Sequence, residues 1–183
     1  METFTDPKDP VENPRYGVQR QNTLAGLSDD LIDGPVLELI RTANRLPFCF
    51  TIQSCWGHFV YSGQSDPRNL APLPITDGIG EVEYRIAYIC LCVECSVSGI
   101  RLLEALKALT AIDPHNVQFG CAEWFWSRQI NSYALQVQPE RFKHKDTAII
   151  GYREALHLEK IRNRFFEALG QIFRDQPATK GCG

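Results

Sequence analysis

The sequence predicts an α/β protein of the α+β kind: a single domain with a mixed β-sheet, helices packed on it and a long C-terminal helix. Short runs of aromatic and β-branched residues alternate with runs whose apolar residues recur at helical spacing. The last helical run, residues 148–174, is the longest. The chain has 183 residues, 44% of them hydrophobic, a size at which one compact domain is the usual arrangement.

The first helix and the first strand have clear limits in the sequence. Ser28 and Asp33 are both good N-cap residues, and Pro35 suits a first helical turn. Pro47 should end the helix, because the residue before a proline is disfavoured in the α conformation. Residues 48–52 then form a short aromatic and β-branched strand. An irregular stretch with several prolines and glycines, residues 61–80, has the length of a binding loop.

The second half of the chain predicts the remaining elements. Residues 85–93 are apolar on both faces, as in a strand covered on both sides. Ser96 or Ser98 should begin a helix that runs to Leu109. Residues 117–126 and 133–137 are expected to be two antiparallel strands that precede the C-terminal helix.

The two ends of the chain are predicted to lie outside the domain, which spans residues 27–175. Residues 1–26 contain prolines among charges and few large apolar groups, so we expect a flexible arm whose removal leaves the fold intact. Residues 176–183 are expected to be a C-terminal tail.

Composition excludes several classes of function. The net charge of −3 argues against a duplex DNA binder, which would show a strong basic excess. Membrane insertion is not expected, because the chain has no run of about 18 apolar residues. The seven cysteines have irregular spacing, and the first residues carry acids and prolines in place of an apolar leader. We therefore expect reduced thiols and a cytoplasmic protein.

The segment Ser54-Cys55-Trp56-Gly57-His58 is the best candidate for a functional site. Gly57 allows a tight turn directly after a buried strand, at a sheet edge where ligands tend to bind. Cys55 and His58 are the candidate catalytic residues, with His58 as a general base, because an imidazole near a thiol favours the thiolate. We expect Ser54, Trp56 and Gly57 to bind ligand. Ser54, Cys55 and His58 should line a solvent-connected pocket instead of the core. A capped turn with a packed Trp56 is the alternative.

Three further groups are weaker candidates. Cys90, Cys92 and Cys95 lack a second ligand pair, so we expect core packing and no metal there. Trp124 and Trp126 would share one face of a strand and could stack on a flat ligand, although such residues are more often core. The basic residues of segment 141–145 and of the last helix, Arg162 among them, are interpreted as an ordinary solvated face.

Residues 29–59 resemble the tRNA wybutosine-synthesising protein 3 family. That family has an acidic, leucine-rich helix, a short strand rich in aromatic residues and threonine, and a Ser-Cys-Ser-Gly-Arg turn. The corresponding parts here are residues 31–46, residues 48–53 and the turn from Ser54 to His58. Trp56 and His58 stand where the family has Ser and Arg.

The order of the later elements is also similar to that family. It continues with a strand and a leucine-rich helix, a strand pair and a long C-terminal helix, here residues 86–93, 100–109, 119–137 and 148–174. The resemblance implies a methyltransferase-type α/β fold that uses S-adenosylmethionine on a modified guanosine of tRNA. The residues by themselves assign no cofactor.

The leading functional prediction is therefore a ligand-binding or enzymatic domain whose site lies at Ser54 to His58. Its partner would be a small molecule or a modified nucleotide. One alternative is a non-catalytic interaction or regulatory module that uses the face of Trp124 and Trp126. The other is a metal-binding domain that uses Cys55 and His58. A concave pocket lined by Ser54 and His58 would favour the first, and a flat apolar patch at Trp124 the second.

Overall fold

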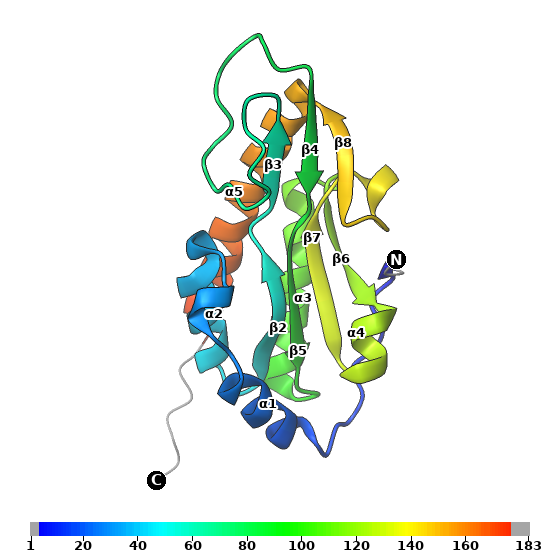
Figure 1. Cartoon of the computed structure of the whole chain (residues 1–183). Coiled ribbons are helices and arrows are strands. Elements are labelled where there is room, and N and C mark those ends of the chain that lie inside the picture. The colour runs from blue at the N-terminus through cyan, green and yellow to red at the C-terminus, as the bar shows by residue number, and fades with distance from the viewer. Residues whose placement is uncertain (1–3, 177–183) are drawn as a thin grey trace.

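The computed structural model describes residues 4–176 and contains two antiparallel β-sheets stacked end to end (Figure 1). The larger sheet has the strand order β1-β6-β7-β5-β2, and the smaller sheet has the order β3-β4-β8. The strands are β1 (Phe4–Thr5), β2 (Cys49–Cys55), β3 (His58–Tyr61), β4 (Glu81–Arg85), β5 (Ala87–Val93), β6 (Val117–Ala122), β7 (Ser132–Val137) and β8 (Thr147–Gly151).

The longest helix, α5, runs behind both sheets and joins them into one body (Figure 1). The helices are α1 (Tyr16–Ala25), α2 (Gly34–Arg45), α3 (Val97–Ala108), α4 (Glu123–Arg128) and α5 (Tyr152–Asp175), with short 3-10 turns at Asp29–Leu31, Leu109–Ile112 and Glu140–Phe142. The α/β class, the single domain and the long C-terminal helix are confirmed. The sheet differs in detail, because the strand pairs are all antiparallel where a mixed sheet was expected.

Local signals in the sequence placed α2 and α3 correctly. Helix α2 begins after Asp33 with Pro35 in its first turn, and its buried face is Val36, Ile40 and Ala43. In α3 the Ser96 hydroxyl accepts a hydrogen bond from the Gly99 amide at 3.2 Å, which satisfies one of the free donors of the first turn.

The chain crosses from the small sheet to the large one at Ile86, so predicted strand 85–93 is in fact the end of β4 followed by β5. Tyr84 holds this crossing. Its buried hydroxyl accepts a hydrogen bond from the Ala87 amide at 3.0 Å and donates one to the Val137 carbonyl at 2.7 Å. This crossing lies beside a second one, the turn at Gly57 where β2 passes into β3. The second crossing contains the candidate site residues Ser54 to His58.

The expectation that residues 117–126 form one strand is wrong. Strand β6 ends at Ala122, and residues 123–128 are helix α4. Because β6 and β7 pair antiparallel, with Gly120 opposite Ala134, the chain must reverse direction between them, and α4 lies in that reversal. The predicted start of the last helix is also too early, since residues 147–151 form β8, with alternate residues buried, before α5 begins.

The N-terminal segment is not a loosely ordered arm. Strand β1 pairs with β6, and α1 packs on β2. The Tyr16 ring lies 5.6 Å from the Phe50 ring, and the Arg20 guanidinium donates to the carbonyls of Asn44 at 2.6 Å and Leu46 at 3.2 Å. Prolines among charged residues predict disorder here, and that prediction is wrong. The buried Tyr16 ring and the hydrogen bonds of Arg20 hold the segment on the domain.

Asn131 ties this segment to the sheet, and its loss should be measurable. Its buried amide accepts a hydrogen bond from the Val11 amide at 2.9 Å and donates to the Val11 carbonyl at 2.7 Å, with the backbone at φ 61°. Asn131→Gly keeps that backbone conformation but removes both bonds. We expect the free energy of unfolding to fall by about 1–2 kcal/mol. Urea titration checks this, and an unchanged midpoint would show that Val11 contributes no stability.

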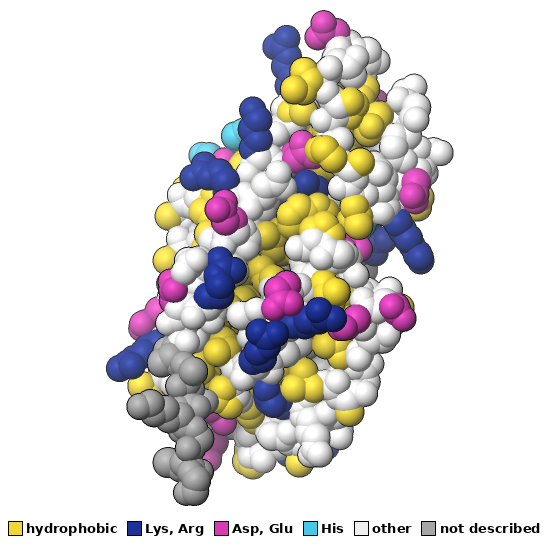
Figure 2. Space-filling view, turned by 90° about the vertical axis from the view of Figure 1, so that its left-hand side faces the viewer, with side chains coloured by type: hydrophobic (Ala, Val, Ile, Leu, Met, Phe, Trp, Pro, Cys, Tyr) yellow, Lys and Arg dark blue, Asp and Glu magenta, His cyan; other side chains and the backbone are white. Residues whose placement is uncertain are grey.

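The charged surface is mixed in sign on the side of the molecule near α2. Figure 2 shows Lys, Arg, Asp and Glu side chains interspersed there around exposed hydrophobic surface. Within residues 4–176, no helix combines the length and the apolar character that a membrane span requires. Of the predicted tail, residues 177–183 lie outside the described part of the chain.

Candidate functional site

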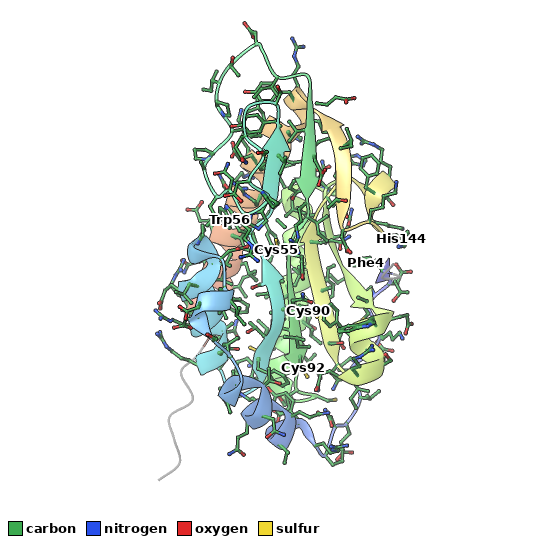
Figure 3. All side chains as sticks on the ribbon, viewed as in Figure 1. Phe4, Cys55, Trp56, Cys90, Cys92 and His144 are labelled. Carbon is green, nitrogen blue, oxygen red and sulfur yellow. The ribbon has the colours of Figure 1, made fainter. Side chains whose placement is uncertain are left out.

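The segment from Ser54 to His58 forms the turn that connects the two sheets. Cys55 ends β2 and His58 begins β3, so the predicted strand continues three residues beyond Ile52 to Cys55. Gly57 lies in the turn at φ 90°, and a Cβ at this position would be 2.8 Å from the Ala87 Cβ. Glycine is therefore required both by the backbone conformation and by the close approach of β5. Figure 3 shows Cys55 and Trp56 at this junction.

His58 is buried, with 4% of its surface exposed, and it has an acidic partner. Its Nε2 lies 3.3 Å from Oδ2 of Asp33, and its Nδ1 lies 3.3 Å from the Asn69 carbonyl oxygen. Sequence reasoning missed Asp33 as a site residue because it assigned Asp33 only as the N-cap of a helix. The carboxylate in fact turns toward the site, where it also accepts the Trp56 amide at 2.7 Å. His58 nevertheless lines two cavities, as a site residue should.

The contact between His58 and Asp33 changes the pKa of both groups. The hydrogen bond that His58 donates to the Asp33 carboxylate, together with the neighbouring Cys55, raises the pKa of His58 to about 10. Burial alone would raise the pKa of Asp33, but its hydrogen bonds with His58 and with the Trp56 amide outweigh this and lower it. At neutral pH the His58 ring is thus held as an imidazolium. It can donate a proton, but it cannot act as the general base that was predicted until it loses one.

Cys55 lies beside this ion pair. Its thiol sulfur, a carboxylate oxygen of Asp33 and a ring nitrogen of His58 all lie within 4.8 Å of one another. The prediction that Cys55 and His58 approach each other across the turn is therefore confirmed. The turn and the N-cap of α2 thus bring three different donor atoms close together.

Trp56 packs against α5 and is not part of the cluster formed by Cys55 and His58. Its ring stacks on Phe166 of α5, with centroids 4.9 Å apart, and the Arg162 guanidinium lies 4.4 Å from its centroid. It belongs to neither cavity that His58 lines. Trp56 is therefore a packed tryptophan, as the alternative interpretation of the turn had it. A ligand in either of those cavities would not contact its ring.

Arg162 holds the turn in place from helix α5. The prediction that it belongs to a solvated face is wrong. With 4% of its surface exposed, it donates to the Gly57 carbonyl at 3.1 Å and pairs with Glu159 at 3.5 Å. Burial lowers its pKa. Glu159 in turn accepts the Leu73 amide of the long loop at 3.0 Å. The position of Arg162 next to Ile161 and four residues after Leu158, both buried, was the signal that could have placed it inward.

A cavity of about 320 Å³ opens beside His58 on the sheet face opposite α5. Its basic side chains are Arg85, Lys143 and Lys145, and its acidic ones are Glu83 and Asp146. Phe4 and Phe125 supply aromatic surface. Figure 3 shows Phe4 and His144, which also lines this cavity, on the side of the molecule opposite Cys55. Sequence reasoning missed this wall, because its residues are far apart in the chain and no local pattern links them.

A second cavity, of about 690 Å³, lies between the sheet edge and the segment from α1 to α2. Ser54, Cys55 and His58 line it together with Asp33, so Ser54 lies where a ligand-binding residue was expected. Gln53, His58, Arg85 and Tyr88 line both cavities. The two cavities therefore meet at His58.

The tryptophan platform is not formed. Trp124 and Trp126 lie on helix α4 and make different contacts. Trp124 is exposed and stacks on Arg128, whose guanidinium carbon lies 3.9 Å from the ring centroid, whereas Trp126 meets Tyr133 edge-on at 5.7 Å. Residues two apart on a helix do not face the same way. Neither ring lines a cavity that His58 lines.

Core packing is confirmed for Cys90 and Cys92, but the same expectation is wrong for Cys95. Cys90 and Cys92 are buried on the same face of β5 (Figure 3). Cys95 is exposed and lies beyond the end of that strand. The Cys92 thiol accepts the Gln129 side-chain amide at 3.2 Å, and burial raises its pKa to about 12. The six cysteines in the described part of the chain are free thiols. The absence of metal at Cys90, Cys92 and Cys95 stays a prediction.

Comparison with known proteins gives no family. No protein-family model matches the chain, and no curated protein matches it significantly. Two solved structures are similar in outline. The PH1069 protein of Pyrococcus horikoshii shares 10% identity over 88% of this chain and 93% of its own, with a TM-score of 0.48. A hypothetical protein of Aeropyrum pernix shares 16% identity over 78% of this chain and 96% of its own, with a TM-score of 0.40.

Proposed function

We propose that this protein is a group-transfer enzyme whose two reactants bind in the two cavities that meet at His58. The observation that carries the proposal is the shared wall of Gln53, His58, Arg85 and Tyr88. Two ligands placed on either side of that wall would present their reacting atoms to each other. Holding two reactants in this way is most of what a transfer reaction requires from a protein.

The smaller cavity suits an anionic nucleotide. Arg85, Lys143 and Lys145 offer positive charge for a phosphate, and Phe4 and Phe125 offer apolar ring surface for a flat base. Amide side chains in the same cavity, those of Gln53 and Gln136, can hydrogen-bond to the polar edges of a base. A modified nucleotide is the reactant that we assign to this cavity.

The larger cavity suits a hydroxyl-rich ligand that need not be anionic. Asp30 and the hydroxyls of Thr23, Ser28 and Ser54 can bond to ribose hydroxyls. We assign S-adenosylmethionine to this cavity. The choice of this cofactor rests on the resemblance to the wybutosine-synthesising protein 3 family, and the polar lining of the cavity is compatible with it.

The transfer step needs little chemistry from the protein. S-adenosylmethionine would supply a methyl group from its sulfonium sulfur, which would keep the electron pair of the broken bond. A nucleophilic atom of the nucleotide would accept the methyl carbon and would lose a proton to solvent. His58, at the boundary of the two cavities, would help to position the two reactants. Cys55 lines the cofactor cavity, and no bond to its sulfur is part of this step.

The cavity at Ser54 and His58 supports this function over a non-catalytic interaction module. Trp124 is exposed, but its ring is stacked on Arg128, and the other exposed residues of α4 are polar: Glu123, Ser127 and Arg128. We place the enzyme in the cytoplasm, since six free thiols suit a reducing compartment.

Binding measurements on the whole chain test the proposal. Guanosine 5′-monophosphate and S-adenosylhomocysteine serve as probes in isothermal titration calorimetry. We expect both to bind, and each to bind in the presence of saturating amounts of the other, because the cavities adjoin without overlapping. Lys143→Ala with Lys145→Ala should weaken nucleotide binding about tenfold and leave the other probe unaffected.

Lys107→Ala with Lys160→Ala is the matched control, since both lysines are exposed and lie outside the two cavities. It should bind both probes as the wild type does. Competition between the probes, or failure of both to bind at millimolar concentration, would contradict the proposal.

A further inference from the structure

We propose that Asp33, Cys55 and His58 hold a zinc ion. These residues bring an oxygen, a sulfur and a nitrogen donor within 4.8 Å of one another, and Cys55 and His58 are buried. Zinc binds these three donor types, and three protein ligands are the usual number when the fourth position is left for water or substrate. Cysteine thiolate excludes magnesium and calcium, which prefer oxygen donors only.

The distances suit a tetrahedral ion with little rearrangement. Zinc lies about 2.0–2.2 Å from nitrogen and oxygen ligands, so two such ligands at the tetrahedral angle are roughly 3.3 Å apart. The observed separation of His58 Nε2 from Asp33 Oδ2 is 3.3 Å. The longer zinc–sulfur bond of about 2.3 Å puts sulfur roughly 3.6 Å from the other donors, within the 4.8 Å that the cluster spans.

Neighbouring groups hold the three ligands in place through hydrogen bonds, as is usual around a bound metal ion. His58 Nδ1 lies 3.3 Å from the Asn69 carbonyl, which selects the tautomer whose Nε2 lone pair faces Asp33 once the proton has left. Asp33 Oδ2 accepts the Trp56 amide at 2.7 Å. Arg162 holds the Gly57 carbonyl at 3.1 Å, which sets the spacing of the turn between Cys55 and His58.

The charges of the proposed site balance. Zinc ligands bind in their deprotonated forms, so Asp33 and Cys55 would each supply one negative charge and His58 none. Zinc brings two positive charges. The cluster stays neutral, so burial adds no uncompensated charge. Asp33, Cys55 and His58 all line the larger cavity, so the open fourth position faces a ligand there.

Cobalt and zinc binding to the purified full chain test the site. In a Cys95→Ser, Cys182→Ser background, we expect one equivalent of Co²⁺ to give a thiolate-to-cobalt charge-transfer band, and zinc to displace it. Native mass spectrometry should show one zinc per chain. Cys55→Ser should abolish the band, and Asp33→Asn should weaken zinc binding at least tenfold, with thermal melting to verify that each variant is folded.

The pair His157 and Asp113 provides the matched control, because the same atoms lie 3.3 Å apart at an exposed position without a cysteine. His157→Gln should bind zinc as the parent does. The proposal fails if Cys55→Ser keeps the band, if His157→Gln loses it, or if the folded parent binds no zinc. The site does not rest on the proposed group transfer, since nucleotide binding at Lys143 and Lys145 is measured without metal.

Discussion

Arg162→Met is expected to lower the free energy of unfolding by about 3–5 kcal/mol. Removing one member of a buried ion pair leaves the other charge without compensation, which costs far more than losing an exposed pair. In this protein the charge left without its partner is the Glu159 carboxylate. The Gly57 carbonyl also loses the hydrogen bond that Arg162 donates to it. Methionine preserves much of the volume against Trp56 and Phe59, so the loss reports mainly on charge and hydrogen bonding.

Two variants separate this explanation from general damage to α5. Arg164→Met lies two residues away on the exposed face and should change stability by no more than about 0.5 kcal/mol. Adding Glu159→Gln to Arg162→Met should recover part of the loss, since it removes the stranded charge. Chemical denaturation gives all three values. If the double variant is no more stable than Arg162→Met, the charge of Glu159 is not the cause.

Gly57→Ala should cost about 2–4 kcal/mol of unfolding free energy, for two separable reasons. An alanine at φ 90° carries backbone strain of about 1–2 kcal/mol. Its Cβ would also lie 2.8 Å from the Ala87 Cβ, so β3 or β5 must shift. A shift there would disturb the wall that the two cavities share, and we expect ligand and metal binding to weaken as well.

Gly63 isolates the backbone contribution. It lies at φ 94°, but a Cβ there would have no atom within 4 Å. Gly63→Ala should therefore cost only about 1–2 kcal/mol and leave the binding site unaffected. Thermal or urea unfolding of both variants gives the difference. Equal losses would mean that the contact with Ala87 relaxes freely.

Local signals explain which elements the sequence could predict. Helix α2 has its N-cap residue, its early proline and its apolar spacing within a dozen residues, and α3 has Ser96. The turn at Gly57 was also found, because the change from apolar to polar residues and the glycine are adjacent in the chain. Such features need no knowledge of what packs against them.

Partners that lie far apart in the sequence explain what could not be predicted. Asp33 reads as a helix cap, and only the folding of β2 against α2 brings its carboxylate to His58. Arg162 reads as one of several basic residues until α5 is placed behind the turn. Trp124 and Trp126 were assigned to a strand because aromatic residues favour strands, but the reversal between β6 and β7 overrides that preference.

The attachment of the N-terminal segment has a consequence for the order of folding. Thr5, Lys8 and Val11 make hydrogen bonds with residues 113 to 125 positions later in the chain. During synthesis, this segment leaves the ribosome before β6 and β7 and has no docking surface until those strands have emerged. Contacts of such wide separation form late, because the entropy of closing a long loop must be lost before the contacts stabilise the chain. These residues are thus expected to be among the last to gain protection from hydrogen exchange, although they are made before their partners.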